Sequence, residues 1–581
     1  MHMINSILFL LLILFNNTLQ KVESTYTLNF DSKNWSYDST NKVYYQIGVV
    51  YCTSPVDTSY QSLGIYVPEE YLVCSNVNEK YDCKVNSSGK KGLYSATNAP
   101  VVFPVETPGY APMKAPTAYN YKTVSNFVSQ GIIYIYAGCR GKYAGGEEYT
   151  AGAPWGVTDL KSAIRFLRYN SKLLPGDLNR MYSFGMSGGG AQSCLMGITG
   201  NSEFFTKYLE NNGAALRDAD GNEIKDNIKG SQCWCPITNL DTADAAYEWN
   251  MGQYYSTNSR AEGNFTRKLS SDLANKYFEY VNELKLKDPS GKELTLTELN
   301  KGTYYDYLLQ IIEESLNNFL SDTTFPYDPS QKGDDHFPPG PPQERRLSTI
   351  YNTAQEYIDH LNEDFSWVTY DSSTNKAKIT SVGDFVKKCK SPTKSVGAFD
   401  SFTKTQAENY VFGVDGVNYA KHFSQIISDL LNENKDVYSK LSNWNASYPD
   451  EYTQDLTKTD SIGKTIKERV SIYNPMYYLN EYYEGYKRSD VADYFRINTG
   501  IFQSDTSNVV EMNLYLALLN YGKNAEFTTV WEKQHVEAER TGNAEDNFIA
   551  WVNKIESPRS DDNAKSIKLN CLLIGLLLLL L

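Results

Sequence analysis

Histidine and long apolar runs are both scarce in this sequence. Only five of its 581 residues are His, so few side chains could act as a general base near neutral pH. The two most apolar runs, 4–15 and 571–581, are shorter than the roughly 20 residues that a membrane-spanning helix needs. We therefore expect no membrane-spanning helix, and any catalytic histidine must come from a short list of candidates.

Basic charge is also in short supply. The chain has 55 Lys and Arg against 69 Asp and Glu, which gives a formal net charge of −14. An acidic chain without basic runs binds nucleic acid poorly, so we expect no nucleic-acid partner. The hydrophobic fraction of 41% is sufficient for a substantial core. The length predicts one large domain with an insertion, or two to three domains.

The two short apolar ends have the patterns of processing signals. Residues 1–24 resemble a secretory signal peptide whose apolar region is 4–15. At the other end, small residues at 560–564, a polar spacer and a Leu-rich tail fit a GPI-anchor signal over 559–581. We expect a chain that enters the secretory pathway and becomes extracellular or surface-bound, touching the membrane only through a lipid anchor.

The cysteines predict disulfide bonds rather than a metal site. There are nine, and removal of the tail with Cys571 leaves an even number that can form up to four disulfides in an oxidising compartment. Cys233 and Cys235 have no matching second pair and no neighbouring His, so we predict no bound metal. Four Asn-X-Ser/Thr triplets fit a glycosylated surface: Asn34, Asn86, Asn264 and Asn445.

Strand-like and helical segments alternate at both ends of the chain but not in its middle. Apolar or β-branched strands are expected at 43–51, 62–67, 131–136, 181–185, 232–237, 494–498 and 527–531. Helices between them predict a mainly parallel sheet covered on both faces. Residues 239–488 are instead rich in Asn, Asp, Lys and Tyr. We predict an α/β core in two parts, 25–238 and 489–558, interrupted by a mostly helical cap, 239–488.

One motif in the first part of the core predicts a nucleophile. Gly185-Met-Ser187-Gly-Gly189 matches G-x-S-x-G, follows a buried strand and opens a helix. In this context it is the nucleophile elbow of an α/β hydrolase, where the turn is too tight for side chains beside the serine. The alternative is a glycine-rich turn without chemistry. We predict an α/β-hydrolase fold with Ser187 as the nucleophile.

A serine nucleophile needs a base and an acid, which in this fold follow it in the order acid, then His. His535 comes shortly after the last predicted strand, and Asp505 follows the strand 494–498. The remaining histidines of the predicted mature chain, His336, His360 and His422, lie inside the insertion. The other acids near His535 are Glu537 and Glu539, which are too close in sequence to approach it easily from a separate loop. We predict the triad Ser187, Asp505 and His535.

The oxyanion hole requires two backbone N–H donors aimed at the developing charge. One should be Gly188, the residue after the nucleophile. The second is expected in the loop after the strand 131–136, with Cys139 favoured and Gly138 as the alternative.

Several segments resemble the bacterial-type tannases and feruloyl-esterase-like α/β hydrolases. The resemblance covers roughly residues 40–555 and is carried by segments 137–141, 185–193, 235–249 and 532–540. It implies a Ser-Asp-His triad, which maps onto Ser187, Asp505 and His535. It also implies a cap that closes over an aromatic acyl group.

The sequence departs from these families at two places. Fungal tannases and related feruloyl esterases link Ser and His through adjacent cysteines, whereas Met186 and Val536 stand at those positions here. Bacterial-type tannases carry an acidic residue two places after the triad Asp to hold galloyl hydroxyls. Counted from Asp505, that place is Ser507. The sequence therefore favours a feruloyl-like or simple carboxylic ester as substrate as much as a galloyl ester.

Three acidic residues follow a core strand at the entrance to the cap: Asp241, Asp244 and Glu248. They could bind substrate hydroxyls at the rim of the site. Alternatively they are the solvated start of a helix, where the helix dipole favours acidic residues. Both interpretations stay open at this point.

Together these features predict a serine esterase that works through an acyl-enzyme and needs no cofactor. The substrate would be a small-molecule or polysaccharide-linked ester, with an aromatic acid favoured. Two alternatives remain: a non-catalytic surface binding protein on a hydrolase fold, and a serine peptidase of the same fold.

Overall fold

The computed structural model describes residues 26–142, 151–329, 349–414 and 419–557. The predicted signal peptide, the predicted GPI-anchor signal and His336 lie outside these residues. No helix in the described ranges is long and apolar enough to cross a membrane.

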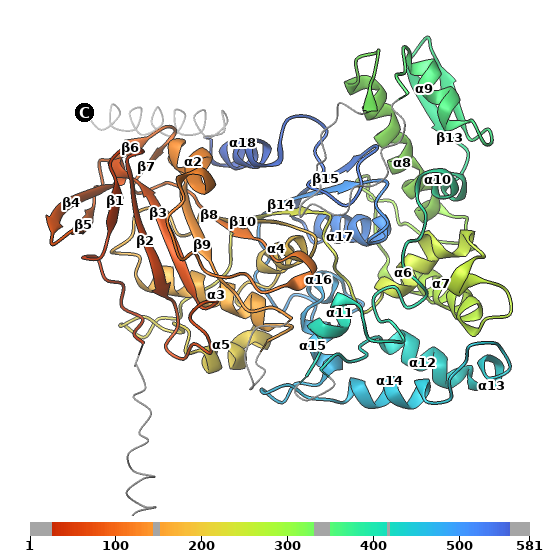
Figure 1. Ribbon diagram of the computed structural model, residues 1–581, viewed down its shortest axis with the longest axis horizontal. Coiled ribbons are helices and arrows are strands. Elements are labelled where there is room, and N and C mark those ends of the chain that lie inside the picture. The colour runs from red at the N-terminus through yellow and green to blue at the C-terminus, as the bar shows by residue number, and fades with distance from the viewer. Residues whose placement is uncertain (1–25, 143–150, 330–348, 415–418, 558–581) are drawn as a thin grey trace, which may run out of the picture.

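A nine-stranded sheet forms the core (Figure 1). Its spatial order is β1-β2-β3-β9-β8-β10-β11-β14-β15. The strands are β1 (Ser36–Asp38), β2 (Val43–Val50), β3 (Ser62–Pro68), β8 (Val101–Val105), β9 (Ile133–Ala137), β10 (Met181–Met186), β11 (Gly230–Trp234), β14 (Tyr494–Gly500) and β15 (Asn524–Val530). The strands from β9 to β15 pair in parallel, and β1, β2 and β3 add antiparallel pairings at one edge. The predicted mainly parallel sheet is confirmed.

Helices cover both faces of the sheet. Successive side chains of β10 point to opposite faces and show which helices lie on each. Ser183 faces α4 (Gly188–Ile198), where its hydroxyl lies 2.9 Å from that of Ser193. The next residue, Phe184, faces α2 (Tyr121–Ser129) and α18 (Ala544–Glu556) and contacts the rings of Phe127 and Phe548. The remaining core helices are α3 (Trp155–Tyr169), α5 (Thr206–Asn212) and α17 (Asn508–Asn520).

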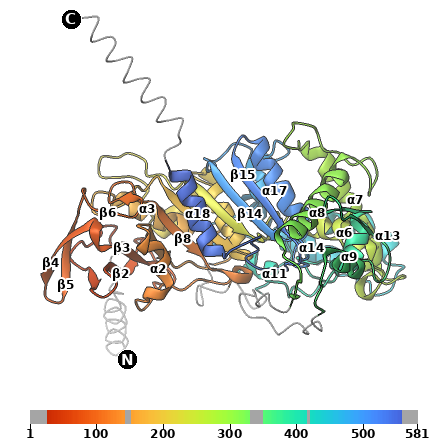
Figure 2. The same ribbon diagram turned by 90° about the horizontal axis from the view of Figure 1, so that it is seen from above.

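The chain leaves the sheet between β11 and β14 and builds a mostly helical insertion. Its α-helices are α6 (Ala243–Asn250), α7 (Phe265–Leu284), α8 (Thr303–Asp322), α9 (Ala354–Leu361), α10 (Val382–Cys389), α11 (Ala407–Val411), α12 (Gln425–Glu433), α13 (Lys435–Tyr438), α14 (Tyr448–Leu456), α15 (Ile466–Ile472) and α16 (Pro475–Leu479). A hairpin of β12 (Val368–Asp371) and β13 (Lys376–Ile379) is the exception. Figure 1 shows the insertion at the opposite end of the molecule from β1 and β2, and Figure 2 shows the same arrangement from above.

The loop after β9 is held rigidly by a buried ion pair. The Arg140 side chain donates to both carboxylate oxygens of Asp159 on α3, and the Arg140 N–H donates to the same carboxylate at 2.9 Å. Both side chains are fully buried. Arg140 also stacks on the ring of Trp155. These contacts give the loop 138–141 a structural role in joining β9 to α3.

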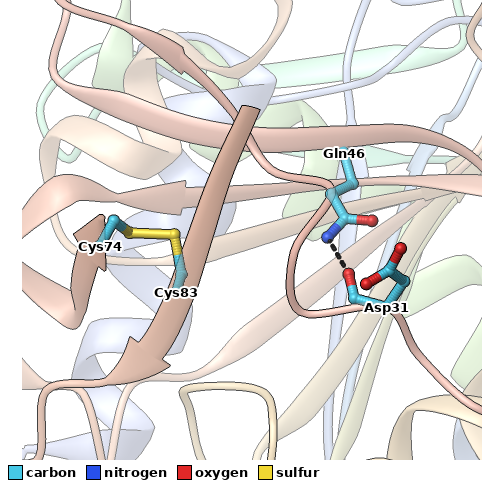
Figure 3. The surroundings of a disulfide bond; sticks show 4 residues. All are labelled: Asp31, Gln46, Cys74 and Cys83. Atoms are coloured by element: carbon cyan, nitrogen blue, oxygen red, sulfur yellow. Dashed lines mark hydrogen bonds between the residues drawn. A yellow bond between two sulfur atoms is a disulfide. The ribbon is translucent and has the colours of Figure 1, made fainter. Parts of the chain in front are cut away.

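One disulfide is formed among the described residues. Cys74 on β4 (Leu72–Val77) bonds Cys83 on β5 (Lys80–Val85), across a hairpin at the β1 end of the molecule (Figure 3). Nearby, the Gln46 amide donates to the Asp31 carbonyl oxygen at 2.8 Å. Five other cysteines are buried thiols: Cys52, Cys139, Cys194, Cys233 and Cys235. The sequence allowed up to four disulfides, but the fold seals these thiols inside the core instead.

Candidate active site

Ser187 stands on a sharp turn between β10 and α4. Its backbone has φ 59° and ψ −123°, a strained conformation for a residue with a side chain. The glycines around it are required by space. A β-carbon on Gly189 would lie 2.0 Å from the Val105 carbonyl oxygen, and one on Gly185 would lie 2.5 Å from the Gly189 oxygen. The turn is the strand-to-helix geometry expected of a nucleophile elbow.

His535 comes from the loop after β15 and meets Ser187 across the end of the sheet. Its Nε2 atom lies 2.7 Å from the Ser187 Oγ, which is hydrogen-bonding distance. The Ser187 residue is only 8% exposed, so the pair is largely shielded from water. With Nδ1 protonated, His535 can accept the serine proton through Nε2.

The position beside His535 Nδ1, where a catalytic triad has a carboxylate, is occupied by the amide of Gln503. The Gln503 Oε1 atom lies 2.6 Å from His535 Nδ1, and the Gln503 side chain is fully buried in the loop between β14 and α17. Asp505, the acid predicted from the sequence, is two residues further along the same loop and exposed. The sequence predicts Asp505 in this position, but the structure places Gln503 of the same loop against the histidine.

The other histidines and acids considered from the sequence have separate roles. His360 is partly exposed on α9 beside Glu363. His422 is buried in the insertion with its Nδ1 atom 2.7 Å from the Asp400 carboxylate. Near His535, Glu537 is exposed, and Glu539 forms an ion pair with Arg496.

The predicted second oxyanion donor is already used within the fold. The Cys139 N–H donates to the Met113 carbonyl oxygen at 2.8 Å, and the Gly138 N–H donates to Ser62 at 3.0 Å. The physical reason is the strand order: β8, not β9, lies next to β10. The loop after β8 therefore approaches the nucleophile. A β-carbon on Gly188 would lie 3.3 Å from the Gly109 nitrogen. Within the described residues, neither Gly188 N–H nor Gly109 N–H donates a hydrogen bond.

The three acidic residues at the start of the insertion mainly hold the insertion together. Asp244 accepts the backbone N–H groups of Phe399 at 2.9 Å and Asp400 at 3.3 Å. Glu248 is buried, binds Arg260 through both carboxylate oxygens and accepts the Ser270 hydroxyl. These bonds use the lone pairs that a substrate hydroxyl would need, which supports a structural role over substrate binding.

Asp241 is the least committed of the three. It is half-buried and accepts the Tyr483 hydroxyl at 2.5 Å. Burial raises its pKa to about 6, and burial raises the pKa of Asp244 to about 7.

A group of charged residues that the sequence did not predict surrounds Glu408, next to the loop after β8. Glu408 lies on α11, which packs against the short helix η2 (Pro108–Tyr110) after β8. Burial raises the Glu408 pKa, Lys394 and Lys142 lower it, and Asp505 raises it, so each of these three charges acts on Glu408. A β-carbon on Gly109 would lie 3.5 Å from the Lys142 Nζ atom, which places that ammonium group beside the loop after β8.

Comparison with known proteins gives one family model and several solved structures. The family model described as BD-FAE matches residues 94–265. A tannase from Fusobacterium nucleatum is 26% identical, with 92% of this chain and 100% of that chain covered and a TM-score of 0.66.

A tannin acyl hydrolase in complex with 3,4-dihydroxybenzoate is 24% identical, with 91% and 99% covered and a TM-score of 0.65. The native Lactobacillus plantarum tannin acyl hydrolase is 23% identical, with the same coverage and TM-score. No curated protein matches the chain by sequence. The predicted fold, an α/β-hydrolase core with a large insertion, is confirmed.

The pKa of Asp244 makes the stability of the insertion depend on pH. Because the folded state raises this pKa from 3.8 to about 7, it binds a proton that the unfolded chain releases. This contribution to stability is fully present below pH 3.8 and is lost as pH rises toward 7. Asp244→Asn should remove that dependence, worth about 3 kcal/mol between pH 5 and pH 8.

The measurement is thermal unfolding of wild type and variant at both pH values. The Tm of Asp244→Asn relative to wild type should be higher at pH 8 than at pH 5. The exposed Asp306 on α8 gives the control, because Asp306→Asn should show an unchanged difference between the two pH values. An equal Tm difference at both pH values for Asp244→Asn would contradict the prediction.

Proposed function

We propose that this chain, a tannase- and feruloyl-esterase-like α/β hydrolase, is a serine esterase acting on esters of aromatic acids. One observation carries the proposal. Ser187 occupies a nucleophile elbow with its hydroxyl 2.7 Å from a ring nitrogen of His535. A hydroxyl, a base and a shielded position are the requirements for forming an acyl-enzyme.

The reaction follows from the positions of these two side chains. His535 Nε2 accepts the Ser187 proton while the serine oxygen attacks the ester carbonyl. The same nitrogen then returns the proton to the departing alcohol, leaving the acyl group on Ser187. In the second half, His535 deprotonates water, which attacks the acyl-enzyme and releases the acid.

Two backbone donors would stabilise the tetrahedral intermediate. Gly188 directly follows Ser187, and the Gly109 nitrogen lies 3.3 Å from where a β-carbon on Gly188 would be. Within the described residues neither N–H has an acceptor of its own. The first is also at the amino end of α4, where the helix dipole favours negative charge. We assign the oxyanion hole to this pair.

The charges around Glu408 support a hydroxylated aromatic acid as the acyl group. A buried carboxylate can accept hydrogen bonds from phenolic hydroxyls, and the ammonium groups of Lys394 and Lys142 can donate to them. The resemblance to bacterial-type tannases implies an acid two places after the triad acid. Counted from Gln503, that place is Asp505. Related structures contain 3,4-dihydroxybenzoate and ethyl gallate, which are such aromatic compounds.

A second function is favoured by the amide beside the histidine. Replacing the carboxylate of a triad by an amide removes the charge that stabilises the imidazolium ion and costs activity. Gln503 in that place is what a non-catalytic protein that binds aromatic acids or esters on a hydrolase fold would have. Activity measurements distinguish the two functions.

We further propose that the protein is exported and held on the cell surface by a GPI anchor. The sequence patterns of 1–24 and 559–581 support this, as do exposed glycosylation triplets at Asn34 and Asn445. Phosphatidylinositol-specific phospholipase C should release the protein from intact cells. Protein that stays bound and still carries Leu581 by mass spectrometry would contradict the anchor.

Loss of the nucleophile should abolish hydrolysis. In Ser187→Ala, kcat should fall by at least about 10⁴-fold while the affinity for an aromatic acid is unchanged, because only the transition state uses the serine oxygen. Methyl gallate, methyl ferulate, methyl benzoate and p-nitrophenyl acetate form the assay panel. Full activity in Ser187→Ala contradicts the esterase proposal, and an inert wild type that binds the free acids favours the binding function.

The Glu408 carboxylate should determine the preference for hydroxylated rings. Glu408→Gln should lower kcat/KM for methyl gallate about 10-fold relative to methyl benzoate, because a lost hydrogen bond costs about 1–3 kcal/mol. Glu363→Gln, a surface carboxylate in the same insertion, is the control and should leave the ratio unchanged. An unchanged ratio in Glu408→Gln would remove this residue from the acyl-binding site.

A further inference from the structure

The amide of Gln503 is fixed at both ends by buried partners. Its Nε2 group donates to the Thr499 hydroxyl at 2.5 Å and to the Glu511 carboxylate at 2.7 Å. Thr499 is in β14 and Glu511 is in the first turn of α17. Neither is exposed to solvent. A continuous hydrogen-bonded chain therefore runs from Ser187 through His535 and Gln503 to Glu511.

These contacts fix which end of the amide faces the histidine. The nitrogen of Gln503 has two hydrogens and two acceptors, which leaves only its oxygen for His535 Nδ1. The flipped amide would place its oxygen against the Glu511 carboxylate, so that two acceptors would face each other without a proton. An ionised Glu511 therefore disfavours the flip strongly.

The attraction of Lys390 favours the ionised form of Glu511, whereas burial raises the pKa of Glu511 to about 8. Lys390, at the end of α10, is buried, and its ammonium group donates to the Asn508 amide oxygen. The Asn508 amide nitrogen in turn donates to Glu511 at 3.3 Å. Burial raises the Glu511 pKa and lowers the Lys390 pKa, while the attraction between the two charges opposes both shifts. A buried carboxyl group and a buried amine thus lie behind the amide, joined through the Asn508 side chain.

We propose that Glu511 is a positioning residue for catalysis, acting through Gln503 to keep His535 in the tautomer that can accept the serine proton. The proposal rests on the proposed esterase function. With the amide oxygen on Nδ1, the ring proton stays there and Nε2 remains a base toward Ser187. A triad with an unconstrained amide fails because the amide nitrogen can face the ring and select the wrong tautomer.

In its ionised form, Glu511 also compensates in part for the missing carboxylate. The negative charge polarises the Gln503 amide and so makes its oxygen a stronger acceptor for the imidazolium ion that forms during reaction. Because this charge is one side chain further away than in a Ser-His-Asp triad, its effect on the imidazolium is weaker. A carboxylate placed directly on Nδ1 should therefore increase the rate.

The test exchanges the two side chains. In Glu511→Gln, kcat should fall about 100-fold with KM nearly unchanged, because the amide orientation is no longer enforced. The double variant Gln503→Glu with Glu511→Gln keeps the number of atoms and charges but moves the carboxylate onto His535. Its kcat should return to the wild-type value or exceed it about 10-fold. Rescue of this kind would not follow from a merely structural role.

Two controls separate the proposal from general damage. Glu537→Gln removes an exposed carboxylate two residues from His535 and should change kcat less than 2-fold. Thermal unfolding of each variant shows whether it is folded, and the double variant retains a counter-charge for Lys390 if Glu511→Gln does not fold. A wild-type kcat in Glu511→Gln, or a folded double variant as slow as a folded Glu511→Gln, would overturn the proposal.

A spectroscopic measurement makes the outcome independent of the substrate. Nitrogen-15 chemical shifts of labelled histidine, with His535 assigned by its loss in His535→Gln, report the ring tautomer directly. Wild type should have the proton on Nδ1, and Glu511→Gln should show a mixture. If wild type hydrolyses no ester and Ser187 does not react with a fluorophosphonate, the esterase function fails. The tautomer still decides the role of Glu511, and a wild-type proton on Nε2 would overturn that role.

Discussion

Close backbone packing around Ser187 is the constraint on which the rest of the site depends. The carbonyl of Val105 approaches Gly189 so closely that no β-carbon fits between β8 and the start of α4. This contact joins the two central parallel strands to the nucleophile helix and forces Ser187 into its strained conformation. The loops after β8, β14 and β15 then supply the second oxyanion donor, the amide and the base, because they reach the same edge of the sheet.

The sequence predicts this core well because its signals are local. Buried strands, the glycine motif at 185–189 and the small number of histidines were sufficient to select Ser187 and His535, which lie 2.7 Å apart. The acid position could not be found in the same way. A search for a carboxylate selects Asp505 and passes over Gln503, because Gln503 carries an amide. No sequence motif reveals that a carboxylate, Glu511, contacts His535 indirectly through that amide.

The oxyanion loop shows a different limit of sequence reasoning. The sequence predicts the second donor in the loop after the strand 131–136, which is β9 in the structure. In space β8 lies between β9 and the nucleophile strand β10, and crossovers of this kind are set by the packing of the whole sheet. Likewise, the even number of cysteines suggested more disulfides than the one that joins Cys74 and Cys83. Whether two thiols meet depends on which strands become neighbours.

Buried carboxyl groups divide between stability and chemistry according to their partners. Asp244 accepts backbone N–H groups and Glu248 binds an arginine, and both hold segments of the insertion together. Glu408 and Glu511 instead lie next to groups that face the reacting atoms. All four carboxyl groups are costly to bury. Substituting each one therefore tests a single role, either in stability or in catalysis and binding.

The long insertion between β11 and β14 has a consequence for how the protein is made. A ribosome that has just completed β11 must add about 260 residues before β14 emerges to pair with it. At ~5–20 residues per second, the edge of β11 waits for ~13–52 s without its neighbour. Unpaired strand edges promote aggregation, so the nascent chain needs a chaperone or early collapse of the insertion over that edge. Sheet completion is therefore among the last steps of folding.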